Sequence, residues 1–191
     1  MDKLKQLINY MSQDFLGGPK LIKLAWVINF QKAATLPFVG LLISVFHDFD
    51  KAPLPLWIYA GLHGGYGLAW WLKDILFPDP SWQIKVTVGG AVMSVILVLG
   101  PYWVLPYLLV VGHADGLTFG WQYLLALLIF VLGLTLMIGA DAQKYFVLKI
   151  RKGLITDGFF RWVRHPNYLG EMMIYGAFAL LAVSYTHLTL P

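Results

Sequence analysis

The sequence predicts an all-α, polytopic membrane protein, a bundle of about five transmembrane helices preceded by a helix on the membrane surface. Hydrophobic residues make up 59% of the chain and charged residues only 13%, whereas soluble domains average about 25% charged residues. The apolar residues form runs of about twenty, the length that a helix needs to cross a hydrocarbon core of roughly 30 Å. Basic residues lie at the ends of these runs, as expected for loops beside a membrane.

The first segment, residues 1–23, is amphipathic. Its apolar residues recur at near-helical spacing, at Leu4, Leu7, Ile8, Met11 and Phe15. It lacks the continuous apolar run of a cleaved signal peptide. We therefore expect a helix that lies on the membrane surface.

Five apolar runs follow and define a predicted transmembrane domain over residues 24–183. They cover residues 24–46, 56–77, 86–101, 117–139 and 166–183. The first is interrupted only mildly by Asn29, Gln31 and Lys32, and a polar, basic segment separates the fourth from the fifth. After Pro101 the third run either continues to Val111 as one kinked helix or breaks there, and the sequence leaves both open.

The positions of the basic residues predict the orientation. One cluster precedes the first run and another lies between the fourth and fifth runs: Lys3, Lys5, Lys20 and Lys23, then Lys144, Lys149, Arg151, Lys152, Arg161 and Arg164. Four predicted crossings separate the clusters, so both fall on one side, which the positive-inside rule makes cytoplasmic. We expect an integral membrane protein, with its N-terminus and the loop 141–165 in the cytoplasm.

Composition also excludes several classes of function. The chain has no cysteine, which rules out disulfides, thiolate metal sites and a cysteine nucleophile, and we predict no metal site. The net charge of +4 does not indicate nucleic-acid binding, because topology alone explains where the basic residues lie. The oligomeric state is not predicted.

Polar residues are densest at the start of the fifth run. Arg164, His165, Asn167, Tyr168 and Glu171 lie within eight residues there. The intervening proline fits the first turn of a helix, whose free amides and positive dipole end form a potential anion site. A carboxylate inside a membrane span usually faces a polar cavity or a partner. This density favours a ligand site.

Each of these residues also has a structural explanation. Asp141, at the end of the fourth run, could pair with Lys144 or Lys149, and Glu171 could stabilise the start of its helix. The basic residues are expected from topology, and His165 could be structural.

The octad RHPNYLGE (164–171), preceded by GFFRW (158–162), resembles the signature of a membrane superfamily. It includes steroid 5α-reductases, sterol reductases, and isoprenylcysteine and phospholipid methyltransferases. ADAQK (140–144) and HGGYG (63–67) are similar to uncharacterised bacterial members of the reductase-like branch. This similarity implies that the membrane is a bacterial inner membrane. The resemblance implies a cofactor, which is NADPH in the reductases and S-adenosylmethionine in the methyltransferases.

Charge favours the reductase branch, because NADPH carries a pyrophosphate and a further phosphate that need several cations. The resemblance then implies a membrane-embedded, NADPH-dependent oxidoreductase acting on the CH–CH bond of a lipid-like steroid or enone. Its cofactor-binding residues would be Asp141, Lys144, Arg164, His165, Asn167, Tyr168 and Glu171. The alternatives are an S-adenosylmethionine-dependent methyltransferase of the isoprenylcysteine or phospholipid type, and a non-catalytic membrane protein.

Reduction of an enone also needs an acid that polarises the carbonyl group. Tyr66 and His63, three residues apart in the second run, are the catalytic candidates, with Tyr59 behind them. The glycines of the same HGGYG motif are equally consistent with close helix packing.

The C-terminus departs from the superfamily, whose members normally continue past the signature helix. Here the apolar run ends near Val183, and residues 184–191 resemble a non-native tail. We therefore expect a chain truncated at its C-terminus that lacks part of the cofactor pocket, and predict no functional residue after Val183.

Overall fold

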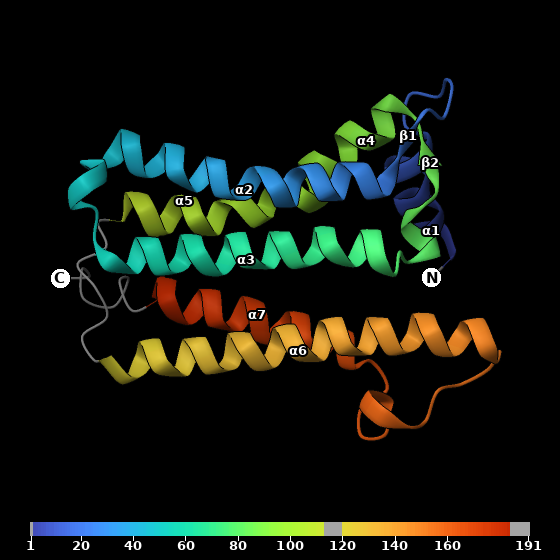
Figure 1. Cartoon of the computed structure of the whole chain (residues 1–191). Helices are drawn as coiled ribbons and strands as arrows, with labels where there is room; N and C mark the ends of the chain where they lie inside the picture. Colours follow the sequence, from blue (N-terminus) through green and yellow to red (C-terminus); the bar gives the residue numbers. More distant parts are fainter. Residues whose placement is uncertain (1, 113–119, 184–191) are drawn as a thin grey trace.

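The computed structural model describes residues 2–112 and 120–183, so the predicted non-native tail lies outside the described residues. The described part is almost entirely helical, which confirms the all-α prediction (Figure 1). The α-helices are α1 (Asp2–Asn9), α2 (Leu24–Phe46), α3 (Leu54–Leu76), α4 (Val88–Ser94), α5 (Val104–Val111), α6 (Gly120–Ile150) and α7 (Pro166–Val183). Short 3₁₀ turns η2 (Phe49–Lys51), η3 (Pro80–Trp82) and η6 (Gly158–Phe160) lie in the loops.

Within residues 2–112 and 120–183, three helical runs are long and apolar enough to cross a membrane. They are Leu24–Phe46, Val88–Val111 and Gly120–Ile150, and they identify the chain as an integral membrane protein by length and composition. Within the described residues, α3 and α7 do not meet the same criterion of length and hydropathy. Polar side chains explain this, since α3 carries His63 and Lys73 and α7 carries Glu171.

The third run is one continuous, kinked helical stretch. The π-turn η4 (Val95–Leu99) and the 3₁₀ turn η5 (Gly100–Trp103) join α4 to α5, and α4 is inclined to α5 in Figure 1. A proline inside a helix lacks the N–H and clashes with the carbonyl one turn earlier. The hydrogen-bond ladder therefore shifts just before Pro101, where the Gly100 amide donates to the carbonyl of Val95.

The fourth helix is longer than the predicted span. α6 continues past Gly139 to Ile150, so Asp141 and Lys144 lie on a helix rather than in an irregular segment. Its residues after Gly139 favour helix, and the next strong breaker is Gly153.

α6 and α7 form a tightly packed hairpin. They cross at Gly133 and Gly170, where a Cβ atom on Gly133 would lie 2.7 Å from the carbonyl oxygen of Gly170. Only glycine permits backbones to approach so closely.

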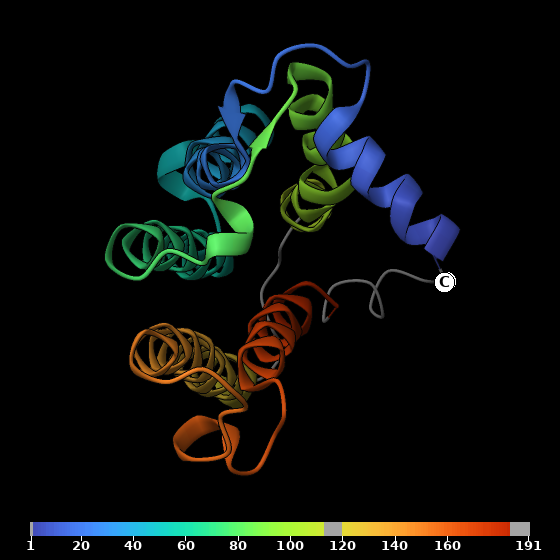
Figure 2. The same ribbon diagram turned by 90° about the vertical axis from the view of Figure 1, so that its right-hand side faces the viewer.

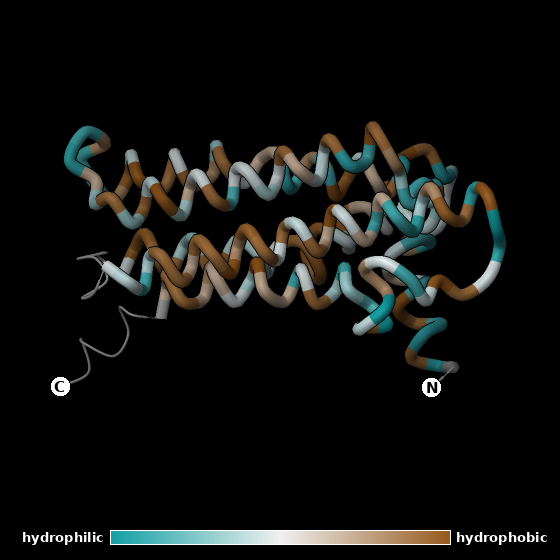
Figure 3. Tube along the Cα trace, turned by 60° about the horizontal axis from the view of Figure 1, so that its bottom comes forward, coloured by the Kyte–Doolittle hydropathy of each residue, from teal (hydrophilic) through white to brown (hydrophobic). Residues whose placement is uncertain are grey.

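The long helices form two groups, which Figure 2 shows almost end-on. α2, α3 and the kinked α4–α5 stretch make one group, and the α6–α7 hairpin makes the other. Figure 3 shows hydrophobic residues along the helix shafts and hydrophilic residues gathered at the two ends. The loop between α6 and α7 lies at the same end as the N-terminus (Figure 1). This agrees with the predicted common side of the two basic clusters, while the orientation in a membrane stays a prediction.

The N-terminal segment is held across that end of the bundle. After α1 and the π-turn η1 (Tyr10–Asp14), strand β1 (Ile22–Lys23) pairs antiparallel with β2 (Lys85–Val86). The amide of Thr87 donates to the carbonyl of Gln13 at 3.0 Å, and its hydroxyl donates to the carbonyl of Phe15 at 3.0 Å. A strand of two residues is too short to show an alternation of apolar and polar residues in the sequence. This attachment of the N-terminal segment was therefore not predicted.

Candidate functional site

One cavity, termed the main cavity because residues of both helix groups and of the N-terminal segment line it, lies between the two helix groups, toward the end that carries the N-terminus. Its volume is about 480 Å³, in the range of small-molecule sites. Apolar side chains such as Ile28, Val98 and Leu99 share its wall with polar ones. The titratable wall residues include Lys32, Tyr66, Lys73, Tyr102, Asp141, Lys144, Tyr168, Glu171 and Tyr175.

A cluster of Lys32, Tyr66 and Tyr175, the lysine–tyrosine cluster, lies on this wall. The Lys32 ammonium donates to the Tyr175 hydroxyl at 3.0 Å and to the Tyr66 hydroxyl at 3.3 Å. The Tyr175 hydroxyl lies 3.4 Å from that of Tyr66 and donates to it. Because a phenol accepts two hydrogen bonds and donates one, this arrangement leaves the Tyr66 proton to donate to another group.

Aromatic rings surround the Lys32 ammonium. It lies 4.3 Å from the ring centre of Tyr66 and 4.8 Å from that of Tyr102, with Trp70 and Tyr175 each at 5.7 Å. No carboxylate lies within 4 Å of it in residues 2–112 and 120–183. Aromatic rings and phenol oxygens are thus the nearest partners of this buried charge, and a buried charge inside a span makes the cavity a candidate functional site.

Lys32 is a candidate site residue that was not predicted from the sequence. It was treated as a mild interruption of an apolar run, although only 5% of its surface is exposed in the structure. A lysine near the middle of a span, rather than at its end, was the available signal. Tyr102 and Tyr175 gave none, because isolated tyrosines are common near membrane interfaces.

Two ion pairs connect α3 and the loop after it to α6. Lys73 and Asp141 are 2.5 Å apart and both buried, and Lys144 lies 3.1 Å from Asp79. Burial alone would raise the pKa of Asp79, but hydrogen bonds from Ser81 and from Lys144 outweigh it and hold this pKa below its usual value. The positive charges of Lys73 and Lys144 are thus already compensated by protein carboxylates.

The structure brings together six of the nine predicted site residues. The cavity wall includes Tyr66, Asp141, Lys144, Asn167, Tyr168 and Glu171. Arg164 and His165 are exposed and do not line the cavity, although the His165 ring stacks on that of Tyr168 at 5.4 Å.

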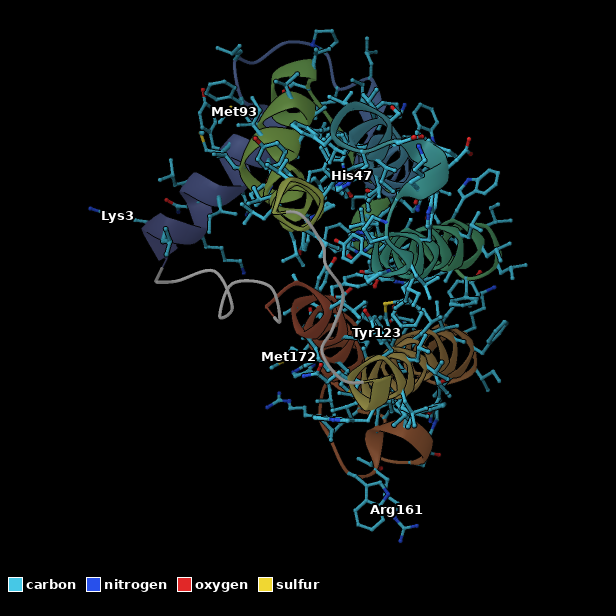
Figure 4. All side chains as sticks on the ribbon, turned by 90° about the vertical axis from the view of Figure 1, so that its left-hand side faces the viewer. Lys3, His47, Met93, Tyr123, Arg161 and Met172 are labelled. Carbon is cyan, nitrogen blue, oxygen red and sulfur yellow. The ribbon has the colours of Figure 1, made fainter. Side chains whose placement is uncertain are left out.

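The loop before α7 folds back along α6, which explains the exposed basic residues. Gln143 donates to the carbonyl of Asp157 at 3.0 Å and accepts from the amide of Phe159 at 2.9 Å. Figure 4 shows Arg161 at the far end of this loop, directed away from the helices. The cations of this loop are therefore presented to solvent rather than to the cavity.

His63 is buried beside the cavity but does not line it. Its Nδ1 lies 2.9 Å from the Tyr59 hydroxyl, and its ring stacks on Phe178 at 4.5 Å. Its Nε2 is buried without a hydrogen-bond partner in the described part of the chain. The structure places His63 behind Tyr66, against α7.

The glycines around Tyr66 pack α3 closely against α2. A Cβ atom on Gly67 would lie 2.7 Å from the carbonyl oxygen of Lys32, and one on Gly64 would lie 3.1 Å from Leu36. The packing explanation holds for these two glycines, while Tyr66 between them lines the cavity. The close approach at Gly67 is what brings Lys32 beside Tyr66.

A family model described as "Protein of unknown function (DUF1295)" matches residues 70–190. No curated protein and no solved structure matches the chain. The matched region includes the predicted cofactor-binding residues and begins after Lys32 and Tyr66.

Proposed function

This chain belongs to the DUF1295 family, and we propose that it is a membrane-embedded, NADPH-dependent reductase of a lipid-like substrate with a conjugated carbonyl group. The lysine–tyrosine cluster on the wall of the main cavity carries the proposal. Its hydrogen bonds leave the proton of Tyr66, a residue of the partly apolar cavity wall, free to donate, with an ammonium beside the phenol oxygen. Methyl transfer makes no use of an acid that polarises a carbonyl.

The chemistry of an enone requires this kind of acid. Addition of hydride to the β-carbon moves negative charge onto the carbonyl oxygen, and a hydrogen-bond donor there stabilises the charge. Tyr66 would donate to that oxygen, and Lys32, 3.3 Å from the Tyr66 hydroxyl, would stabilise the phenol as it gives up its proton. The apolar part of the wall, with Ile28 and Leu99, fits the hydrocarbon body of such a substrate.

Residues near the start of α7 form two groups, which would bind different parts of a dinucleotide. Asn167, Tyr168 and Glu171 on the wall offer hydrogen-bonding groups, and Arg164 and His165 next to them are exposed. The wall cations Lys73 and Lys144 are compensated by carboxylates, so the phosphate groups would be held by the exposed basic residues. Bound NADPH would supply the hydride.

We further propose that α3 and α7 also cross the membrane, which gives five spans with the N-terminus and the loop 141–165 in the cytoplasm. Both helices run alongside the three apolar spans (Figure 1), and several of their polar residues line the cavity rather than face lipid. The chain has no cysteine, so a single cysteine can be introduced as Lys51→Cys or as Lys152→Cys. Labelling reagents applied to one side or the other of bacterial inner-membrane vesicles then show on which side each cysteine lies. If α3 crosses, three crossings separate the two positions, so the cysteines should be labelled from opposite sides. Labelling of both from the same side would contradict the crossing by α3.

Calorimetry on detergent-purified protein tests the cofactor, with NADPH and S-adenosylmethionine titrated side by side. We expect NADPH to bind, Arg164→Ala to weaken its binding, and Lys51→Ala, at the other end of the bundle, to leave it unchanged. Binding of S-adenosylmethionine alone would overturn the reductase in favour of a methyltransferase. Turnover of 3-oxo-4-ene steroids and long-chain enones, followed by NADPH absorbance, then tests the substrate class.

A further inference from the structure

α1 is strongly amphipathic, with its apolar face bordered on both sides by lysine. Successive residues of an α-helix are about 100° apart, so Leu4, Leu7 and Ile8 share one face, with Lys3 at one edge and Lys5 at the other. Leu4 and Leu7 are 64% and 56% exposed. Lysines in these positions extend their ammonium groups to the headgroup layer while the leucines reach below it.

The bundle holds α1 in the orientation that a membrane surface requires. α1 runs across the end of the bundle, at a steep angle to the long helices (Figures 1 and 2). Hydrogen bonds from Thr87 to the carbonyls of Gln13 and Phe15 fix the segment that follows α1. Lys3 points away from the other helices in Figure 4, so its charge is available to an external partner.

The loop after η1 adds a second apolar contact at the same end. Leu16 has a φ of 60°, a conformation that non-glycine residues rarely adopt, and its side chain is exposed. Leu21 is exposed as well, and so is Trp26 in the first turn of α2. An exposed tryptophan at the start of a span is typical of a membrane interface.

From this arrangement we infer that α1 binds the anionic headgroup layer of the membrane and forms the rim of the main cavity there. The partner is an anionic phospholipid surface, because the helix combines an apolar face with two cations at its edges. Ile8 belongs both to that face and to the cavity wall. An amphiphile in the same leaflet therefore meets the cavity beside α1. The surface binding does not depend on the proposed reductase activity.

Single-cysteine labelling tests this directly, because the chain has no native cysteine. An environment-sensitive fluorophore is attached at Leu7→Cys, on the apolar face, or at Gln6→Cys, on the opposite face, as the matched control. The full chain is reconstituted into vesicles of phosphatidylcholine alone, or with phosphatidylglycerol added in equal part. We expect the label at position 7 to be quenched by lipid-attached quenchers and the label at position 6 by aqueous iodide.

The charge contribution is tested by adding Lys3→Gln and Lys5→Gln to the Leu7→Cys chain. Lipid quenching at position 7 should be stronger with phosphatidylglycerol, fall at high salt, and lose both dependences in the charge variant. Equal iodide quenching at positions 6 and 7 would overturn the inference, because α1 would then lie in water. Protection of both positions that grows with protein density would also overturn it, because a second protein copy would then cover α1.

Discussion

At the scale of a single residue, Tyr66 is almost fully buried and also lines the cavity. Its oxygen accepts hydrogen bonds from Lys32 and Tyr175, which directs its own proton elsewhere. Its neighbours Gly64 and Gly67 give the backbone its close fit against α2. The sequence motif around Tyr66 thus contains one candidate reactive group supported by residues that serve packing.

Replacing Tyr66 by phenylalanine should lower turnover of an enone substrate by about 100-fold or more, the usual contribution of a general acid. NADPH binding should change little, because the ring and its packing are retained. Steady-state kinetics and calorimetry measure the two effects separately. Tyr107→Phe, an exposed position on α5, is the control. Unchanged turnover in Tyr66→Phe would remove this residue from the mechanism.

Asp79 makes stability depend on pH. Hydrogen bonds from Ser81 and Lys144 hold its folded pKa below its usual value despite burial, so the carboxylate stabilises the fold above the unfolded pKa of about 3.9. That contribution is lost as the pH falls through the lower, folded pKa. Thermal unfolding of Asp79→Asn should therefore occur below that of the natural chain at neutral pH, and the difference should shrink in acid. A difference that is constant from neutral to acid pH would contradict this.

At the scale of elements, helix bounds were largely predictable and helix irregularities were not. The predicted runs 24–46 and 166–183 coincide with α2 and α7, because hydropathy and Pro166 mark their ends. The π-turn before Pro101 and the extension of α6 to Ile150 depend on backbone hydrogen bonding, which hydropathy does not report. The buried lysine of α2 was missed for a related reason, since its compensation comes from rings on other helices.

The crossing of α6 and α7 depends on Gly170. A Cβ atom there would lie 2.6 Å from the backbone nitrogen of Met137, so Gly170→Ala should force the helices apart and destabilise the protein by about 1–3 kcal/mol. Gly176→Ala on the same helix meets no described atom within 4 Å and should be neutral or slightly stabilising. Thermal unfolding in detergent measures both, and equal effects would show that the crossing is not tight.

At the scale of the whole molecule, the cavity lies where the two helix groups meet. The boundary between the two groups, the seam, is partly polar. The Lys73–Asp141 pair lies on that seam, buried on both sides. Asp141 was predicted to bind a cofactor or, alternatively, to pair with Lys144 or Lys149. Its actual partner lies on α3, a distance along the chain that no local pattern encodes. The signature motif therefore predicted Asn167, Tyr168 and Glu171, which lie on the cavity wall, but no sequence pattern predicted the pairing of the buried charges.

Removing one member of the Lys73–Asp141 pair should destabilise the whole protein. Lys73→Met leaves the Asp141 carboxylate buried without its cation, which typically costs about 3–5 kcal/mol. The double variant Lys73→Met with Asp141→Leu removes both charges and should recover most of that loss. Lys51→Met, which breaks an exposed pair with Asp48, should change stability by at most about 1 kcal/mol. Thermal unfolding of the four proteins in detergent gives the comparison. If the double variant is as unstable as the single one, packing along the seam, rather than the buried charge, holds the two groups together.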